Sequence, residues 1–244
     1  MALQEIPAFS KPEWQTSDIS RDELSFAPAK RIQQSFVSAA EKKTLLWLAA
    51  RTPDWINSDH LTALGFAGNI AAGLCYALAA RKPMMLLVAV ACLAVNWLGD
   101  SLDGTLARVR DRQRPRYGFY VDHVIDTFSA FLLMGGLALS GYVHPAVAMG
   151  MLVAFLMLSV ELYLASYTLK TFRLSYAKFG PTEIRILLAI GSVALLFRPV
   201  IHIFGRAYLL FDVGGVIAIV GMAGILVVSA ICHTLQLYRE ERLH

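Results

Sequence analysis

Residues 84–107 read MMLLVAVACLAVNWLGDSLDGTLA, an apolar run that ends in two aspartates three residues apart. Such a run is long enough to cross a bilayer, for which about 20 residues suffice. Apolar runs of the same kind lie on both sides of it, and together they predict an all-α integral membrane protein. Buried helices of a soluble protein are the weaker alternative. We expect about six transmembrane helices, at 61–80, 84–107, 120–141, 145–168, 182–197 and 208–236.

The composition of the chain agrees with this fold class. Apolar residues make up 57% of the 244 positions and charged residues 16%, whereas about 25% are charged in soluble domains. This balance disfavours a soluble domain, a disordered chain and a disulfide scaffold. The 3 cysteines stand far apart in apolar runs, and their spacing matches neither a metal site nor a redox motif.

The charged residues are unevenly distributed. Residues 1–59 hold 15 of them, and 10 more lie between positions 100 and 126. This predicts a cytoplasmic N-terminal arm over 1–59 and a six-helix transmembrane catalytic domain over 60–244. Within the arm, residues 29–50 mix apolar and basic side chains, as a helix in the membrane interface does. The alternative is a solvated helix that packs on the protein itself.

Lysine and arginine counts predict the orientation in the membrane. With a cytoplasmic N-terminus, 18 of these residues fall on the cytoplasmic side of the predicted helices and 4 on the other side. Cytoplasmic loops of membrane proteins carry an excess of basic residues. We therefore expect a multi-pass protein with both termini and the charged patch on the cytoplasmic side.

Four aspartates are the central feature of the charged patch. Asp100 and Asp103 are three residues apart, and Asp122 and Asp126 are four apart, so each pair shares one face of its helix. A short loop joins the two helices, which predicts antiparallel neighbours whose aspartate faces meet. Converging carboxylates need a cation, and all-oxygen ligation suits two Mg²⁺ or Mn²⁺ ions. The alternative is helix-end acids paired with nearby arginines, although charges at membrane depth are usually functional.

Small residues and one arginine lie between the aspartate pairs. Gly104 and Ala107 share the aspartate face and leave room for a ligand to approach the backbone, and Gly118 follows in the next helix. Arg108, one turn beyond Gly104, is placed to bind a phosphate with its planar guanidinium. Helix packing is the alternative role of the small residues. The aspartates nearby favour ligand contact.

The pattern Asp100-x2-Asp103-Gly104-x2-Ala107-Arg108-x9-Gly118-x3-Asp122-x3-Asp126 resembles the signature of the CDP-alcohol phosphatidyltransferase family. Six membrane helices with cytoplasmic termini also match that family. The resemblance implies an enzyme of phospholipid biosynthesis. In the reaction, an alcohol attacks the β-phosphorus of a CDP-linked donor, CMP leaves and a phosphodiester forms. The donor is then CDP-diacylglycerol or a CDP-amino-alcohol, and the acceptor is a small alcohol or a lipid.

The resemblance also implies roles for individual residues. Asp100, Asp103 and Asp122 hold the metal ions, and Asp126 contributes to the metal site and is the general base. The residues implied for the CDP moiety are Gly104, Ala107, Arg108, Gly118 and, on weaker grounds, Asp59 and Thr62.

Polar residues outside the patch leave their alternatives open. The basic residues Lys170, Arg173 and Arg185 follow the fourth predicted helix. In relatives, basic residues in this region bind the phosphate of the acceptor. Basic residues at the cytoplasmic ends of membrane helices also anchor those helices in the membrane. Glu161, midway along the fourth predicted helix, marks either a lipid cavity or a structural hydrogen bond. Gly68 and Ala72 have a spacing that allows close helix contact, which is compatible with a homodimer.

Two other function classes compete with the resemblance. An aspartate-rich, Mg²⁺-dependent membrane prenyltransferase also uses carboxylates, but it usually has a further acid where Ala107 stands. A cation-coupled transporter, which is not an enzyme, should disperse its acids near the bilayer midplane. The aspartates cluster at one end of two helices instead, which favours the transferase.

Overall fold

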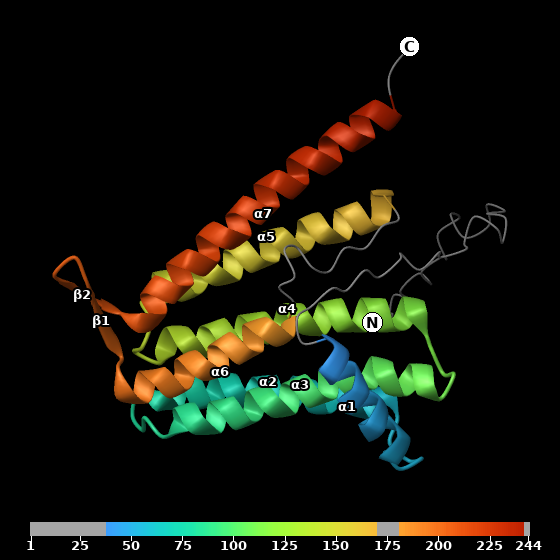
Figure 1. Cartoon of the computed structure of the whole chain (residues 1–244), viewed down its shortest axis with the longest axis horizontal. Helices are drawn as coiled ribbons and strands as arrows, with labels where there is room; N and C mark the ends of the chain where they lie inside the picture. The colour runs from blue at the N-terminus through green and yellow to red at the C-terminus, as the bar shows by residue number, and fades with distance from the viewer. Residues whose placement is uncertain (1–37, 170–180, 242–244) are drawn as a thin grey trace, which may run out of the picture.

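The computed structural model describes residues 38–169 and 181–241 (Figure 1). These ranges form helices and one hairpin: α1 Ser38–Arg51, α2 Ser58–Ala79, α3 Met85–Val109, α4 Pro115–Leu139, α5 Pro145–Leu169, α6 Pro181–Phe197, β1 Val200–Ile203, β2 Arg206–Leu209 and α7 Leu210–Glu240. Helices α2 to α5 and α7 are long and apolar enough to cross a membrane. With 17 residues, α6 is at the short end of the range of about 17–25 for a membrane helix. The predicted fold class is confirmed.

Local sequence signals set the helix starts. Pro115, Pro145 and Pro181 are the first residues of α4, α5 and α6, where the missing amide hydrogen of proline costs no helical hydrogen bond. Helix α4 therefore begins five residues before the predicted start at 120. Helix α2 begins with a capping box, in which Asn57 Oδ1 accepts the backbone N–H of His60 and His60 Nδ1 accepts the backbone N–H of Asn57.

A β-hairpin lies between α6 and α7, where the sequence indicated no strand. β1 pairs antiparallel with β2, and Phe204 and Gly205 form the turn with φ angles of 50° and 77°. Two-residue hairpin turns of this kind need positive φ, which glycine adopts without strain. The β-branched residues of β1 favour the extended backbone. The last helix consequently starts at Leu210 rather than at 208.

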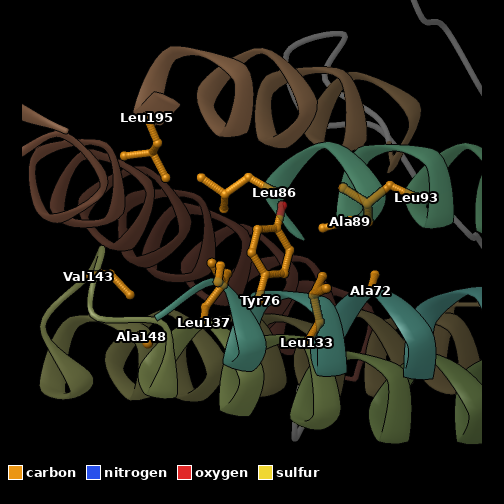
Figure 2. Close-up of a cluster of buried hydrophobic side chains, with 11 residues drawn as sticks. Ala72, Tyr76, Leu86, Ala89, Leu93, Leu133, Leu137, Val143, Ala148 and Leu195 are labelled. Carbon is orange, nitrogen blue, oxygen red and sulfur yellow. The ribbon is translucent and has the colours of Figure 1, made fainter. Parts of the chain in front are cut away.

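Helix α2 lies in the middle of the bundle. It packs closely on both α3 and α4, whereas α3 and α4 make few direct contacts with each other. The expectation that α3 and α4 are packed neighbours is therefore wrong, because the glycine-rich helix α2 approaches both more closely. The core between these helices contains Tyr76 and Leu137, both fully buried (Figure 2). The Tyr76 hydroxyl meets Ser192 Oγ of α6 at 2.7 Å, which satisfies it inside the apolar core.

Helices α5 and α7 form a pair at the side of the bundle. In Figure 1, α7 runs away from the other helices at an angle, and it packs mainly on α5. Glu161 of α5 joins the two, because its Oε1 accepts Ser229 Oγ at 3.0 Å and lies 2.6 Å from His233 Nδ1. These contacts support the structural hydrogen bond among the two roles left open for Glu161.

Helix α1 packs on the protein through one face. Leu45 and Ala49 are buried against α2 and α3, while Leu46 and Trp47 on the other side are exposed. This half-apolar exposure suits a membrane interface, and the placement of α1 on the membrane stays a prediction. Residues 29–37 of the predicted interfacial helix lie outside the described residues.

Candidate active site

A small hollow between α2, α3 and α4 gathers acidic side chains. Its lining includes Asp100 from α3 and both Asp122 and Asp126 from α4, together with Thr62 of α2 and Asn96 of α3. The three aspartates are exposed rather than buried, so a ligand can reach their carboxylates. Their convergence was predicted from the helical spacing, and α2 forms the wall of the hollow between α3 and α4.

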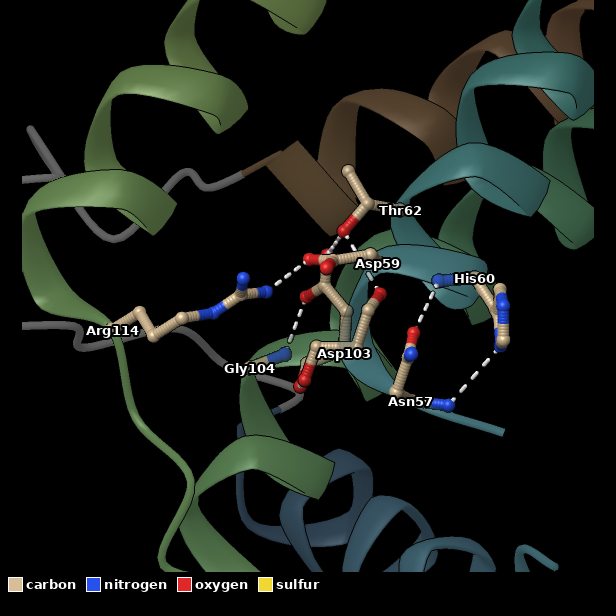
Figure 3. A network of polar contacts seen from close by, with 8 residues as sticks. Asn57, Asp59, His60, Thr62, Asp103, Gly104 and Arg114 are labelled. Carbon is tan, nitrogen blue, oxygen red and sulfur yellow. Dashed lines mark hydrogen bonds and ion pairs between the residues drawn. The ribbon is translucent and has the colours of Figure 1, made fainter. Parts of the chain in front are cut away.

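Asp103 has a different position from the other three aspartates. It is buried against α2, where its Oδ2 accepts the hydroxyl of Thr62 at 2.6 Å (Figure 3). Its other carboxylate oxygen accepts the backbone N–H of Gly104, and its main-chain oxygen accepts Ser58 Oγ at 3.0 Å. These bonds hold the Asp103 carboxylate in one orientation behind the hollow.

Arg185 brings a positive charge from α6 to the hollow. Its Nη2 donates to Asp100 Oδ2 at 2.6 Å, and its charge also interacts with that of Asp126. The alternative of acids paired with arginines therefore applies to Asp100, although the partner comes from α6 rather than from the loop that follows α3. Lys170 and Arg173, predicted with Arg185, lie outside the described residues.

A larger, open cavity of about 390 Å³ lies beside the first turn of α2 and the last turn of α3. Of the residues predicted for the CDP moiety, Ala107 and Asp59 line this cavity and Thr62 lines the smaller hollow. The cavity wall is rich in guanidinium groups, which suit a diphosphate. The full lining is Asn57, Ser58, Asp59, Leu106, Ala107, Arg110, Arg112, Gln113 and Arg114.

Two arginines fix the walls of this open cavity. Arg110 donates to the main-chain oxygens of Thr52 at 2.7 Å and Ile56 at 2.5 Å, which ties the α1–α2 connection to the end of α3. Arg114 pairs with Asp59 (Figure 3) and lies 4.2 Å from the ring centre of Tyr117. The hydrogen bond and charge of Asp59 raise the pKa of the Arg114 guanidinium, so this guanidinium stays charged at any physiological pH.

The remaining motif residues are accessible. Arg108 is exposed and donates to Thr105 Oγ1 at 3.1 Å on its own helix. A Cβ atom added at Gly104 would meet Arg108 Nη1 at 3.5 Å, which is an ordinary contact, and one at Gly118 would meet nothing within 4 Å. Packing within the described residues therefore does not require glycine at either position.

The donor set around the hollow fits a hard divalent cation. Carboxylate oxygens of α3 and α4 are the ligands that Mg²⁺ and Mn²⁺ prefer. As the side chains stand in the described ranges, no three His, Cys, Asp or Glu residues are close enough to enclose a metal ion. One carboxylate, that of Asp100, is turned to Arg185.

Sequence reasoning missed several residues that shape the site. Asn57 and Asn96 carried detectable signals, since asparagine is a preferred helix N-cap and a polar residue inside an apolar run is a functional candidate. Arg110 and Arg114 carried none, because five arginines crowd residues 108–116 and the spacing does not say which of them contacts the α1–α2 connection. His123, next to Asp122, contacts the ring of Tyr163 on α5 with its own ring.

Comparison with known proteins identifies the family. A search of curated proteins found no match. The family model described as CDP-alcohol phosphatidyltransferase matches residues 55–232, which include every described residue of the hollow and of the motif. That match covers well over half of the chain and contains the four aspartates in their expected order. The chain therefore belongs to the CDP-alcohol phosphatidyltransferase family.

Proposed function

We propose that the protein transfers a phosphatidyl or phospho-alcohol group from a CDP-linked donor to an alcohol acceptor, with release of CMP, in phospholipid biosynthesis. Membership of the family supports a phosphatidyl-transfer role in lipid synthesis. The observation that carries the proposal is the hollow itself, which Asp100, Asp122 and Asp126 line, together with the open, arginine-rich cavity. Carboxylates that can bind cations therefore lie close to guanidinium groups that can bind phosphates.

The open cavity is the proposed site of the CDP group. Ala107 and Asp59 line it, and the guanidinium groups on its wall match the charge of the diphosphate. Arg108 lies on the same turn of α3 as Ala107 and offers a planar donor pair to one phosphate. Gly118 leaves the backbone open to the ligand, because a Cβ atom there would meet nothing within 4 Å, and at Gly104 only the end of the Arg108 side chain lies within that distance.

The proposed cofactors are two divalent cations, Mg²⁺ or Mn²⁺, consistent with a family that generally depends on divalent cations. Asp100, Asp103, Asp122 and Asp126 would hold them. When bound, such ions neutralise the charge of the diphosphate and of the transferred phosphorus. The hydrogen bonds from Thr62 and Gly104 fix Asp103 in advance, so that less conformational freedom is lost when a cation binds.

Asp126 is the proposed general base. It lies one helical turn beyond Asp122, deeper along α4, and its exposed carboxylate lines the hollow. An alcohol that attacks phosphorus must lose its proton, and a carboxylate within hydrogen-bonding reach can accept it. Asp126 would therefore orient the acceptor hydroxyl and take its proton, in addition to any contact with a cation.

Arg185 is the proposed contact for an anionic acceptor. Its side chain extends from α6 to Asp100 at the hollow. A guanidinium group can bind a phosphate through two parallel hydrogen bonds. A phosphorylated alcohol with a CDP-diacylglycerol donor would use this charge. A diacylglycerol acceptor with a CDP-amino-alcohol donor would not, so the role of Arg185 distinguishes the two schemes.

The site is proposed to face the cytoplasm. The α3–α4 connection, the start of α2 and the end of α7 lie at one end of the molecule, opposite the hairpin (Figure 1). Of the 22 lysines and arginines, 18 fall on that side of the predicted membrane helices. A homodimer is proposed only from the spacing of Gly68 and Ala72, and both residues are buried against other parts of the same chain.

Product analysis tests the proposed reaction. Purified protein with Mn²⁺ is incubated with a panel of CDP donors and alcohols, and CMP and lipid products are identified by mass spectrometry. We expect CMP release that depends on one added alcohol, and we expect it to disappear in Asp126→Asn. Diphosphate release from a prenyl donor would instead indicate a prenyltransferase, and ion uptake into vesicles without CMP would indicate a transporter.

A further inference from the structure

The carboxylate of Glu41 on α1 joins three helices. Its Oε1 accepts the indole N–H of Trp97 on α3 at 2.9 Å and the hydroxyl of Thr182 on α6 at 2.9 Å. The side chain is half-buried at this junction. A solvated helix would leave its acidic residues in water, whereas this one satisfies two donors from elements distant in sequence.

Each partner of Glu41 lies one helical turn from a member of the Asp100–Arg185 ion pair. Trp97 is three residues before Asp100 on α3, and Thr182 is three residues before Arg185 on α6, so each pair shares one helix face. Asp100 and Arg185 form the ion pair between the same two helices. Glu41 therefore bridges α3 and α6 one turn away from the contact that brings Arg185 to the hollow.

Among the described helices, α6 has one main packing partner. It packs mainly on α3, and it makes only slight contact with α7. A carboxylate that accepts a hydrogen bond at the first turn of α6 is also favourable for the helix dipole. The hydrogen bond from Thr182 to Glu41 is therefore one of the contacts that hold the start of α6, one turn before Arg185.

From this geometry we propose that Glu41 is a positioning residue for the transfer reaction: by bridging Trp97 and Thr182 it holds the start of α6 so that Arg185 stands beside Asp100. The inference rests on the proposed function, in which Arg185 binds the acceptor. Helix α1 lies before the residues matched by the family model. The proposal gives this helix a role in positioning the residues of the site.

Deuterium exchange of the protein in lipid nanodiscs tests the placement of α6 without any catalysis. We expect Glu41→Ala to increase exchange of the amides over 181–190. Glu41→Gln keeps an acceptor oxygen and should stay close to wild type. Lys43→Ala, an exposed change on the same helix, is the matched control and should change nothing. Unchanged exchange in Glu41→Ala would overturn the proposal.

Steady-state kinetics then test the action through Arg185. Glu41→Ala should raise the acceptor KM about tenfold, the size of effect expected when one charge-assisted hydrogen bond is lost, with the donor KM unchanged. Arg185→Gln should raise the acceptor KM as well, and adding Glu41→Ala to it should change little further. Additive effects, or equal losses for donor and acceptor, would overturn the positioning role. Raised exchange in a protein that releases no CMP would support the placement of α6 and overturn only the proposed reaction.

Discussion

The glycines of the α2 contacts and the glycines of the aspartate motif differ in what surrounds them. A Cβ atom added at Gly136 of α4 would lie 2.0 Å from the main-chain oxygen of Gly73 on α2, and one at Gly99 of α3 would lie 2.5 Å from the main-chain nitrogen of Gly65. At Gly118 it would meet nothing within 4 Å. The same residue type thus allows close helix contact in one region and leaves open space in the other.

Because of this difference, the residues that determine stability and the residues that are available for chemistry are separate groups on the same helices. Backbone atoms that meet across α2–α3 and α2–α4 cannot move aside, so a side chain there must push the helices apart. At the end of α3 and the start of α4, Arg108, Asp122 and Asp126 are exposed, so packing constrains these side chains little. Substitutions in the first region should therefore change folding, and those in the second should change chemistry.

Asp126→Asn should have the largest effect, and only on chemistry. The amide keeps the size of the side chain but cannot accept a proton near neutral pH, so turnover should fall about 10²–10⁴-fold. Because Asp126 is exposed, the melting temperature should stay at the wild-type value. Calorimetric titration should still detect donor binding with Mn²⁺. Donor affinity that falls in step with turnover would make Asp126 chiefly a metal ligand.

Gly136→Ala should break the contact of α2 with α4. Its methyl group would collide with the main chain of Gly73, and overpacking of this kind typically costs about 1–3 kcal/mol in free energy of unfolding. Thermal unfolding in detergent, followed by circular dichroism, measures the loss. Gly135→Ala is the control, since the added methyl group meets nothing within 4 Å. Equal stability of the two variants would contradict the packing role of Gly136.

The same comparison explains which features of the fold and of the site could be predicted from the sequence. The apolar runs and the paired aspartates were readable, because membrane length and helical spacing leave few alternatives. The central place of α2 was not, because Gly65, Gly73, Gly99 and Gly136 look like any other glycines until their neighbours are known. The hairpin at 200–209 was hidden by its short strands, and the bridge made by Glu41 joins elements far apart in the chain.

Gly118→Ala should raise the stability of the protein and lower its affinity for the donor. Replacing a helical glycine by alanine stabilises a helix by about 0.5–1 kcal/mol where space allows, and the space above Gly118 is open. If the CDP group occupies that space, the methyl group should raise the donor KM about tenfold, equivalent to ~1.4 kcal/mol. Gly135→Ala should gain the same stability without the change in KM. An unchanged donor KM in Gly118→Ala would place the donor elsewhere.

Arg108→Lys should have the smallest effect, confined to the donor. The ammonium keeps the charge but loses the planar pair of donors, so donor affinity should fall roughly fivefold, as for the loss of about 1 kcal/mol of net hydrogen bonding. Arg108 is exposed and donates to Thr105 on its own helix, so the free energy of unfolding should not change. Calorimetry with the CDP donor and Mn²⁺ measures the affinity, and Mn²⁺ alone should bind as in wild type. The control is Arg116→Lys, an exposed change at the start of α4 outside the motif, which should leave donor affinity unchanged. If both variants bind the donor equally well, Arg108 acts as a membrane anchor, and the open region then owes its donor binding to the other groups that line the larger cavity.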